Sequence, residues 1–449
     1  MVAVSGDESD GARTNGWDNP DFVDRTEAVV RLGSMLLSAG TGAYRVKHAM
    51  ARAAMALGMD RHDAAVSLTE IITTTHMGDN FRTVVREVPR VAVDARRIEA
   101  LETLSRNMPN GCDAFFLESR LDHISRHVKS IWPAWLNVLS AGMACAAFAV
   151  LNRFSIEEAL VVLIASASGQ AVRRTLARRE ANQFGVAAIA GAVSSLVYLI
   201  VSVLCRAQPW LPLHNVDGTG YVAAILFLVP GFPMMTAVLD IARLDFGAGL
   251  PRAFYAMAIV LSAGAGAWAI CLVFGLEPLP PGYQITGVWW WIAIAVSTFI
   301  GICGFAVMFN STPAMIWRAA LAGTLANLTR FALSAAGVPD AAGSFIGGLI
   351  TGLLAFAFAN HNTLPRITLS VPGSVIMVPG AAMYRTLYWF NASNTTQAIT
   401  FGMDALIGVL ALASGLAAAR MCTDPGWTIM RWRPSPHAFR TEEGSTLIG

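Results

Sequence analysis

The feature that most constrains this chain is a Pro-Gly pair that interrupts two of its long apolar segments. Pro230-Gly231 lies in the apolar run 221–241, and Pro379-Gly380 lies in another run 149 residues further on. Proline removes a backbone donor and clashes with the preceding turn, so a helix kinks or breaks there. Inside a bilayer, the freed amide and carbonyl groups must face protein or a wet cavity, because hydrocarbon offers no hydrogen bonds. In transporters, broken helices of this kind form substrate sites near the middle of the membrane.

Composition indicates a membrane protein. Of the 449 residues, 55% are hydrophobic and only 14% are charged. A soluble chain carries about 25% charged residues, so we predict a polytopic α-helical protein that spans the lipid bilayer. The six cysteines are scattered singly, without disulfide or zinc spacing, and we expect neither a cofactor nor a metal site. The net charge of +2 gives no indication of a nucleic-acid partner.

A polar head precedes the apolar body. Residues 1–130 hold 16 of the 32 Lys and Arg residues, and residues 1–21 predict a disordered tail. Helical spacing of apolar residues, runs rich in Val, Ile and Thr, and glycine stops predict a small α+β domain over residues 22–130. Its expected elements are helices at 23–37 and 44–57, strands at 65–75 and 81–88, and helices at 94–108 and 113–129.

The head carries no catalytic signature. It contains no Gly-x-Ser-x-Gly, P-loop or His-Glu-x-x-His pattern, so we do not expect an enzyme. His123 and His127 lie one helical turn apart, which suits a metal, but no third ligand follows at fixed spacing. We interpret this pair as a solvated helix face, and Glu70 with residues 73–76 as a strand edge.

Ten apolar segments follow, each near the length of about 20 residues that a bilayer requires. They cover residues 131–151, 158–172, 184–205, 221–241, 254–274, 286–309, 313–335, 341–358, 367–384 and 398–419. We group them into a first half, residues 131–275, and a second half, residues 284–420, followed by a cytoplasmic tail at 421–449. Each Pro-Gly pair falls in the fourth segment of its half. Because five is odd, the halves point in opposite directions, which predicts two inverted five-helix repeats.

The distribution of arginine predicts the orientation. If the head lies inside, nine arginines fall in the inner connections and four in the outer ones. Basic residues are enriched in cytoplasmic loops, so the head and both termini are predicted to be cytoplasmic.

Ionisable side chains at membrane depth are costly and therefore informative. Asp240, near the inner end of the first broken segment, is a candidate proton or cation site, with a helix-end or loop-anchoring role as the alternative. Arg330 lies one turn after Asn327, and Arg385 follows Tyr384 just beyond the second break.

Three stretches resemble the threonine/serine exporter family. They are residues 31–41 with 44–46 and 56–58, residues 228–233 with Asp240 and 247–252, and residues 378–380 with Tyr384-Arg385. The resemblance spans about residues 25–420. It implies a cytoplasmic head and ten spans that export small hydroxy amino acids on the proton-motive force. A related two-subunit form is associated with export of dicarboxylates such as succinate, and this chain resembles the fused form. Aligned on the breaks, Asp240 falls opposite Trp389, so the acidic group is not duplicated.

Our hypothesis is a secondary transporter of the bacterial cytoplasmic membrane that exports L-threonine and L-serine with protons as the coupling ion. The candidate substrate-binding residues are Pro230, Gly231, Thr236, Asn327, Pro379, Gly380, Tyr384 and Arg385, with Thr324 as a further candidate and Asp240 for proton coupling. Two alternatives stay open. One is dicarboxylate export, with Arg330 and Arg385 as partners of the second carboxylate; the other is a membrane anchor for a sensory or hydrolytic head. The sequence leaves homo-oligomer formation open.

Overall fold

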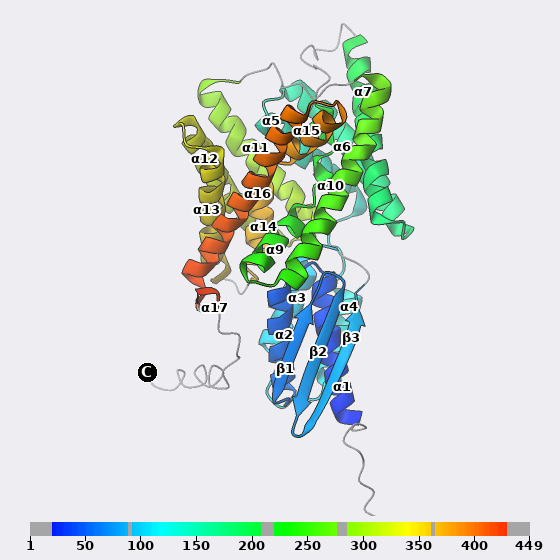
Figure 1. The fold of residues 1–449 in the computed structure, drawn as a ribbon, viewed down its shortest axis with the longest axis vertical. Helices are drawn as coiled ribbons and strands as arrows, with labels where there is room; N and C mark the ends of the chain where they lie inside the picture. Colours follow the sequence, from blue (N-terminus) through cyan, green and yellow to red (C-terminus); the bar gives the residue numbers. More distant parts are fainter. Residues whose placement is uncertain (1–19, 89–91, 208–219, 276–284, 361–363, 429–449) are drawn as a thin grey trace, which may run out of the picture.

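The chain folds into a head at one end and a helical body at the other (Figure 1). The computed structural model describes residues 20–88, 92–207, 220–275, 285–360 and 364–428. The tail predicted for residues 1–21 lies outside the described residues, except that residues 20 and 21 begin the first helix. Of the tail predicted for residues 421–449, only residues 421–428 are described. They are helical except at Asp424.

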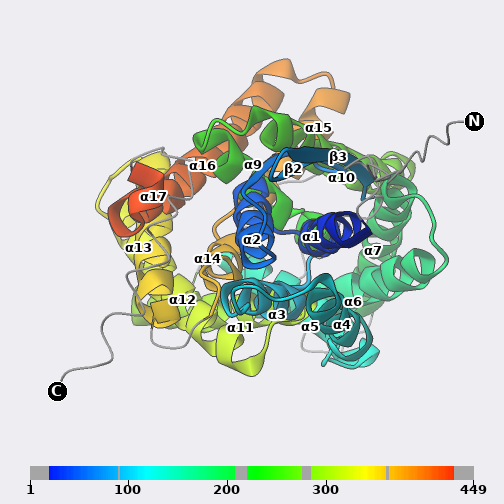
Figure 2. The ribbon, with the colours of Figure 1, turned by 90° about the horizontal axis from the view of Figure 1, so that it is seen from below.

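The head has three layers. Its elements are α1 (Pro20–Ser38), α2 (Ala43–Ala56), β1 (Arg61–Val66), β2 (Glu70–Met77), β3 (Asn80–Glu87), α3 (Ala95–Arg106) and α4 (Ala114–His127). The antiparallel sheet β1-β2-β3 forms one layer, α1 and α2 the next, and α3 and α4 the third (Figures 1 and 2). Leu32, Met50, Leu101 and Leu117, from all four helices, are fully buried in its core. The predicted α+β class of the head therefore matches the structure.

The prediction of one strand at 65–75 was wrong. The chain turns between Val66 and Glu70, and the amide of Ser67 donates to the Glu70 carbonyl at 2.8 Å. The strand β2 then pairs with both neighbours, so that Thr73 lies opposite Ala64 of β1 and Val84 of β3. The three residues of this turn include no glycine, proline, asparagine or aspartate, which are the usual signals of a turn.

The body contains two groups of helices. The first group is α5 (Ala134–Leu151), α6 (Ile156–Arg178), α7 (Gln183–Ala207), α8 (Tyr221–Ala224), the 3-10 turn η2 (Leu226–Leu228), α9 (Gly231–Ala242) and α10 (Phe246–Phe274). The second group is α11 (Gly287–Met308), α12 (Pro313–Ala335), α13 (Asp340–Asn360), α14 (Ile367–Val375), α15 (Gly380–Asn391), α16 (Thr395–Thr423) and α17 (Pro425–Thr428). Seen from below, α1 and α2 of the head lie across the middle of these helices (Figure 2).

Length and composition identify a multi-pass membrane protein. Six described helices, namely α5, α7, α10, α11, α13 and α16, are long and apolar enough to cross a bilayer. The count rises to eight if the bent pairs α8–α9 and α14–α15 each form one span. Both α6 and α12 have 23 residues but are less apolar, and α6 carries charged residues at both ends. The expected count of ten spans therefore depends on α6 and α12.

Candidate translocation site

The two Pro-Gly breaks share one local geometry. Pro230 has φ −80° and ψ 61°, and the amide of Gly231 donates to the carbonyl of Val229 at 2.8 Å. Pro379 has φ −77° and ψ 57°, and the amide after it donates to the carbonyl before it, also at 2.8 Å. These values are close to those of an inverse γ-turn. The two turns bend their helix pairs by 58° and 51°, so both predicted breaks are present.

The breaks lie against each other across the two halves. A Cβ added to Gly231 would lie 3.2 Å from Cγ2 of Val375, which ends α14. A Cβ added to Gly380 would lie 2.9 Å from Cδ2 of Leu226 and 3.1 Å from Cγ2 of Val229. Each glycine therefore permits the opposite half to approach its turn, and a larger side chain at either position would push the halves apart.

The space between the breaks is small and apolar. A cavity of about 10 Å³ is lined by Phe148, Leu226, Val229, Gly231, Phe305, Val375, Val378 and Gly380. About one water molecule fits in such a volume. The rings of Phe148 and Phe305, from α5 and α11, meet edge to face with centroids 5.8 Å apart. This conformation is closed at the breaks, and a molecule larger than water enters only if the two halves separate.

Asp240 lies where the body meets the head. Its Oδ1 accepts the backbone amide of Ala43 at 3.1 Å, in the first turn of α2. Its Oδ2 lies 3.3 Å from Nη1 of Arg252, and both side chains are buried. Arg252 also donates to the carbonyl of Thr41 at 3.3 Å. The N-terminal end of α2 favours a carboxylate because the helix dipole is positive there. Asp240 therefore binds the start of α2 to the body.

Three further contacts hold the head against both halves. Lys47 Nζ lies 2.7 and 2.8 Å from the carboxylate oxygens of Asp245, which precedes α10. The side chain of Asn310, after α11, donates to Asp94 at 2.8 Å. The amide of Ala95 donates to the Phe309 carbonyl at 2.9 Å. The head therefore spans the junction of the two halves on the side to which it is attached.

Thr236 does not face the second break. Its hydroxyl donates to the carbonyls of Phe232 and Pro233 in its own helix, at 3.0 and 3.1 Å. Thr236 lines a separate cavity of about 10 Å³, together with Gly40 of the head and Arg252. Thr236 and Asp240 thus belong to the head-facing end of α9.

Tyr384 and Arg385 lie beyond the second break. The Tyr384 hydroxyl donates weakly to the carbonyl of Ile225 at 3.5 Å, and its ring lines a cavity of about 20 Å³ with Tyr221 and Cys271. The guanidinium of Arg385 lies 5.7 Å from the ring centre of Phe401. Tyr384 is therefore near the first break, whereas Arg385 is not among the residues that line that cavity.

Asn327 belongs to a third polar group in α12. Its side-chain amide donates to the hydroxyl of Thr298 at 2.8 Å, and its carbonyl oxygen accepts Nε of Arg330 at 3.0 Å. The nearby hydroxyl of Thr324 is buried and finds no hydrogen-bond partner among the described residues. The structure therefore brings Gly231 and Gly380, one from each Pro-Gly pair, to the same cavity but leaves Thr236, Asn327 and Arg385 in separate surroundings.

Comparison with known proteins gives the family. A family described as "Putative threonine/serine exporter" matches residues 27–275, which is more than half of the chain, and "Threonine/Serine exporter, ThrE" matches residues 294–422. The chain belongs to the threonine/serine exporter family. The matches cover both halves of the body and most of the head, so the chain joins these two family regions in one polypeptide.

Individual relatives of the family are distant. The "Probable threonine/serine exporter" of Mycobacterium tuberculosis (strain H37Rv) is 22% identical over 89% of this chain and 76% of its own length. The "Probable succinate transporter subunit YjjP" of Escherichia coli (strain K12) is 26% identical over 56% of this chain and 95% of its own length. The protein of the same name from Klebsiella aerogenes is 25% identical over similar shares. No solved structure matches the chain.

One buried carboxylate of this exporter-family chain escaped the sequence analysis. Glu158, in the first turn of α6, accepts the amide of Gly220 at 2.8 Å and the hydroxyl of Tyr198. Its own amide donates to the side chain of Ser155, the residue that caps α6, at 3.0 Å. Serine followed three residues later by glutamate is the signature of a capping box. That pattern was visible in the sequence, but the predicted span began at Glu158 and so left the capping residue Ser155 outside the helix.

Proposed function

We propose that this chain is a secondary exporter of L-threonine, L-serine or close analogues, located in the bacterial cytoplasmic membrane with its head and both termini cytoplasmic. Family membership and the M. tuberculosis relative, which aligns over both halves, support the substrate class. The observation that carries the proposal is the pair of equivalent helix breaks that meet between the halves. Broken helices at a repeat interface are the usual substrate site of such carriers.

We further propose ten spans in two inverted five-helix halves. The packing supports this arrangement: α6 packs on α5 and α7 as α12 packs on α11 and α13, and α10 packs on α7 and α9 as α16 packs on α13 and α15. Between the halves, α9 packs on α16 and α15 packs on α10. Left-handed residues also end corresponding helices. They are Arg153 and Asn310 after α5 and α11, Glu180 and Gly337 after α6 and α12, and Leu244 and Ser393 after α9 and α15.

The substrate would bind where the breaks separate. The helices α9 and α15 both begin at this point, and their positive N-terminal ends favour an α-carboxylate. The carbonyls freed by Pro230 and Pro379 suit the ammonium group. A shift of α12 would bring Thr324 or Asn327 toward the substrate hydroxyl, and Thr236 and Tyr384 lie one to two turns from their breaks. Export would alternate between this closed state and states that open on either side.

Proton coupling is assigned to Asp240 through the head. Protonation of this carboxylate would remove its attraction to Arg252 and weaken its bond with the Ala43 amide. Lys47 and Asp245 are the other charged groups nearby, and they pair with each other. A proton on Asp240 would therefore loosen the contact between α2 and α9, the helix that begins at the first break.

Efflux from preloaded cells tests the substrate. Cells that lack their own exporters are loaded with labelled threonine, serine or succinate, and efflux is followed with and without an uncoupler. We expect uncoupler-sensitive loss of threonine or serine. Exchange of Pro230-Gly231 for Ala-Ala should abolish this efflux while expression is retained, whereas Gly185→Ala, where an added Cβ meets nothing within 4 Å, should not change it. Unaltered efflux from the Pro230-Gly231 variant would overturn the site.

Dicarboxylate export is the second candidate, because two relatives that match 56% of the chain are each named "Probable succinate transporter subunit YjjP". Here Arg330 or Arg385 would bind the second carboxylate. Neither guanidinium has a carboxylate within ion-pair distance among the described residues. If only labelled succinate leaves the cells in the same efflux experiment, this candidate is selected and export of threonine and serine is excluded.

A further inference from the structure

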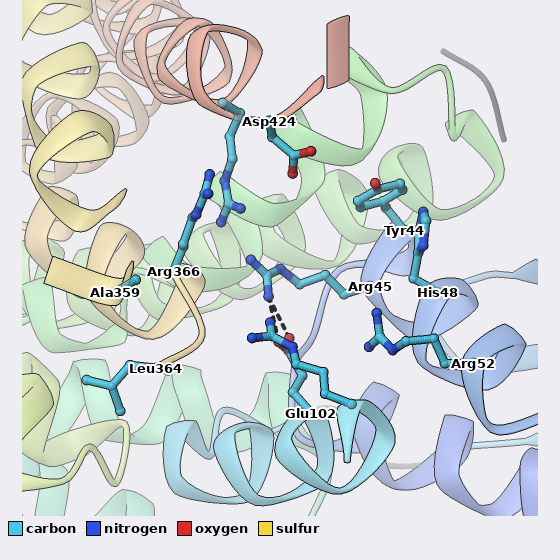
Figure 3. Close-up of a pocket in the computed structure, with 11 residues that line it drawn as sticks. Tyr44, Arg45, His48, Arg52, Glu102, Ala359, Leu364, Arg366 and Asp424 are labelled. Atoms are coloured by element: carbon cyan, nitrogen blue, oxygen red, sulfur yellow. Dashed lines mark hydrogen bonds and ion pairs between the residues drawn. The ribbon is translucent and has the colours of Figure 1, made fainter. Parts of the chain in front are cut away.

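A further cavity lies apart from the breaks, between the head and the second half of the body. It has a volume of about 380 Å³ and is walled by α2 and α3 on one side and by the ends of α13, α14 and α16 on the other (Figure 3). Its size falls in the range of about 300–1,000 Å³ that is typical of small-molecule sites. The cavity shares no residue with the one between the breaks.

The lining of this cavity is strongly basic. Five arginines reach it, namely Arg45, Arg52 and Arg106 from the head and Arg366 and Arg420 from the body. Only two carboxylates, Glu102 and Asp424, accompany them. The fixed charge of the lining is therefore positive, and in Figure 3 Arg52 and Arg366 lie on opposite sides of the opening with Arg45 between them.

Two of these arginines, Arg45 and Arg106, form ion pairs with Glu102. Arg45 Nη1 lies 2.6 and 2.8 Å from its two oxygens, and Arg106 Nη2 lies 2.9 Å from Oε2. Burial alone would raise the pKa of Glu102, but Arg45 and Arg106, helped by Arg52, outweigh it, and the pKa is lowered. Glu102 is thus a carboxylate whose charge is already matched by its neighbours.

The other three arginines have no carboxylate partner within ion-pair distance in the described part of the chain. Arg52 donates to the hydroxyl of Ser105 at 2.9 Å, and Arg366 donates to the hydroxyl of Thr423 at 3.1 Å. The guanidinium of Arg420 makes no hydrogen bond with the described residues, although its backbone carbonyl accepts the amide of Asp424 at 2.8 Å. Burial lowers the pKa of Arg52 and of Arg366, because each cation loses solvation, and the nearby carboxylates of Glu102 and Asp424, respectively, offset this loss only in part. Like charges gathered in a partly buried space repel one another, and a bound anion relieves that repulsion.

His48 lines the same cavity, and its pKa can report whether an anion is bound there. It lies one turn from Tyr44 and Arg52 on α2, with its ring centre 4.2 Å from that of Tyr44. Burial, followed by the nearby Arg52 and Arg243, lowers the pKa of His48 to about 4. The imidazole is therefore neutral near pH 7, and a negative charge placed in the cavity would raise its pKa.

We propose that this cavity binds a small multivalent anion, one that carries two or more carboxylate or phosphate groups. Guanidinium groups match the planar oxygens of both chemistries and bind them bidentately. Of the three arginines without carboxylate partners, Arg52 lies in α2 of the head. Arg366 precedes α14 and Arg420 lies in the last turn of α16, both in the second half of the body. One anion would therefore bridge the head and the body, and its presence would hold the head in the docked position.

Binding to the purified full-length protein tests this proposal. Titration calorimetry with succinate, citrate, inorganic phosphate and pyrophosphate separates carboxylates from phosphates, and neutral glutamine serves as the blank. We expect saturable binding of succinate, citrate or pyrophosphate, and weaker binding of inorganic phosphate, which carries a single phosphate group. Arg420→Gln and Arg52→Gln should each weaken it roughly tenfold or more, because a hydrogen bond to a charged group contributes about 1.5–3 kcal/mol. Arg178→Gln, an exposed arginine outside the cavity, should leave it unchanged.

Two additional readouts separate this site from the translocation site. The Pro230-Gly231→Ala-Ala variant should bind the anion normally, so failure of the transport proposal leaves this one standing. The NMR titration of His48 should move to higher pH when the anion is present. Absence of saturable binding by every anion, or binding that both cavity variants retain in full, would overturn the proposal.

Discussion

The two halves of the body agree at their breaks and differ at the ends of the broken helices. Both breaks have the same backbone angles and the same short hydrogen bond, and each glycine faces the other half. In the first half, Asp240, Asp245 and Arg252 follow the break, and all three contact the head. A register of 149 residues places Trp389, Asn394 and Phe401 at these positions in the second half, and none of them is charged.

This difference separates two roles. The shared turn is the part that both halves need, which fits a role in translocation. The three charged residues after the break occur only in the first half, where each contacts the head, which fits a role in docking. The helix break and the docking site lie on the same short helix, α9, in which Asp240 is the ninth residue after Gly231. A change in docking can therefore reach the break through one rigid element.

The largest effect is expected from filling the contact between the breaks. Gly231→Val and Gly380→Val each place branched carbons where a Cβ alone already lies about 3 Å from the other half. We expect each variant to lose efflux by about 100-fold or more, since a misplaced site of about 1 Å has that effect on rate. Gly185→Val is the matched control. Loss in only one of the two glycine variants would break the equivalence of the halves.

The second-largest effect, on docking of the head, is expected from replacing Asp240 and not from replacing Trp389, its counterpart in the second half. Asp240→Asn removes the charge that pairs with buried Arg252, and breaking a buried pair costs about 3 kcal/mol or more. We expect the head to detach more readily, measured as faster tryptic cleavage at Lys129 in the connection between α4 and α5. Trp389→Phe in the second half should not change this cleavage. Equal rates of cleavage in Asp240→Asn and Trp389→Phe would contradict a role of Asp240 in docking the head.

Acid should loosen the head through two histidines. Burial lowers the pKa of His48 and of His62 to about 4, whereas an unfolded histidine titrates near 6.5. Between these values the unfolded state binds more protons, so stability is present above about pH 6.5 and falls as the pH drops toward 4. The loss should reach about 2 kcal/mol per histidine by pH 4.5.

Two single variants sharpen this pH effect. His48→Gln should reduce the acid sensitivity of docking, followed by cleavage at Lys129, and should leave the part that comes from protonation of Asp240. His62→Gln should instead affect the melting of the head, because His62 hydrogen-bonds Thr73 inside the sheet at 2.8 Å. A pH profile that neither variant changes would contradict the assignment.

The smallest effect is expected at Lys47 and Asp245. Their side chains are partly exposed, so replacing Asp245 by Asn, the residue that the second half has at this position, should cost about 1 kcal/mol or less. Cleavage at Lys129 should rise slightly, and more at low salt than at high salt, because salt already screens the pair. An effect as large as that of Asp240→Asn would show that the two contacts are not independent.

The sequence predicted what depends on local chemistry. Proline and glycine act on their own backbone, so both breaks were found at Pro230 and Pro379. The helices of the head followed from apolar spacing and the glycines after them. The turn at residues 67–69 was missed because it lacks glycine, proline, asparagine and aspartate, and Ser67 and Thr69 favour turns more weakly. The spans at α6 and α12 are the least clear in composition because charged or polar residues interrupt their apolar faces.

What could not be predicted depends on distant partners. Asp240 accepts an amide 197 residues earlier in the chain, and no local pattern indicates that contact. The basic cavity joins Arg52 with Arg366 and Arg420 from the opposite end of the sequence. Each arginine alone resembles an ordinary loop or helix-end residue. Their shared position appears only when the head docks on the second half.

The central claim is that two equivalent breaks form one translocation site for a small amino acid. The most direct test is uptake of labelled threonine and serine into proteoliposomes that contain the purified full-length protein, under an imposed proton gradient. The wild type should transport at least one of them, and Pro230-Gly231→Ala-Ala and Pro379-Gly380→Ala-Ala should each abolish transport while the head stays docked. Transport that survives either double exchange, with the protein correctly folded, would contradict the account.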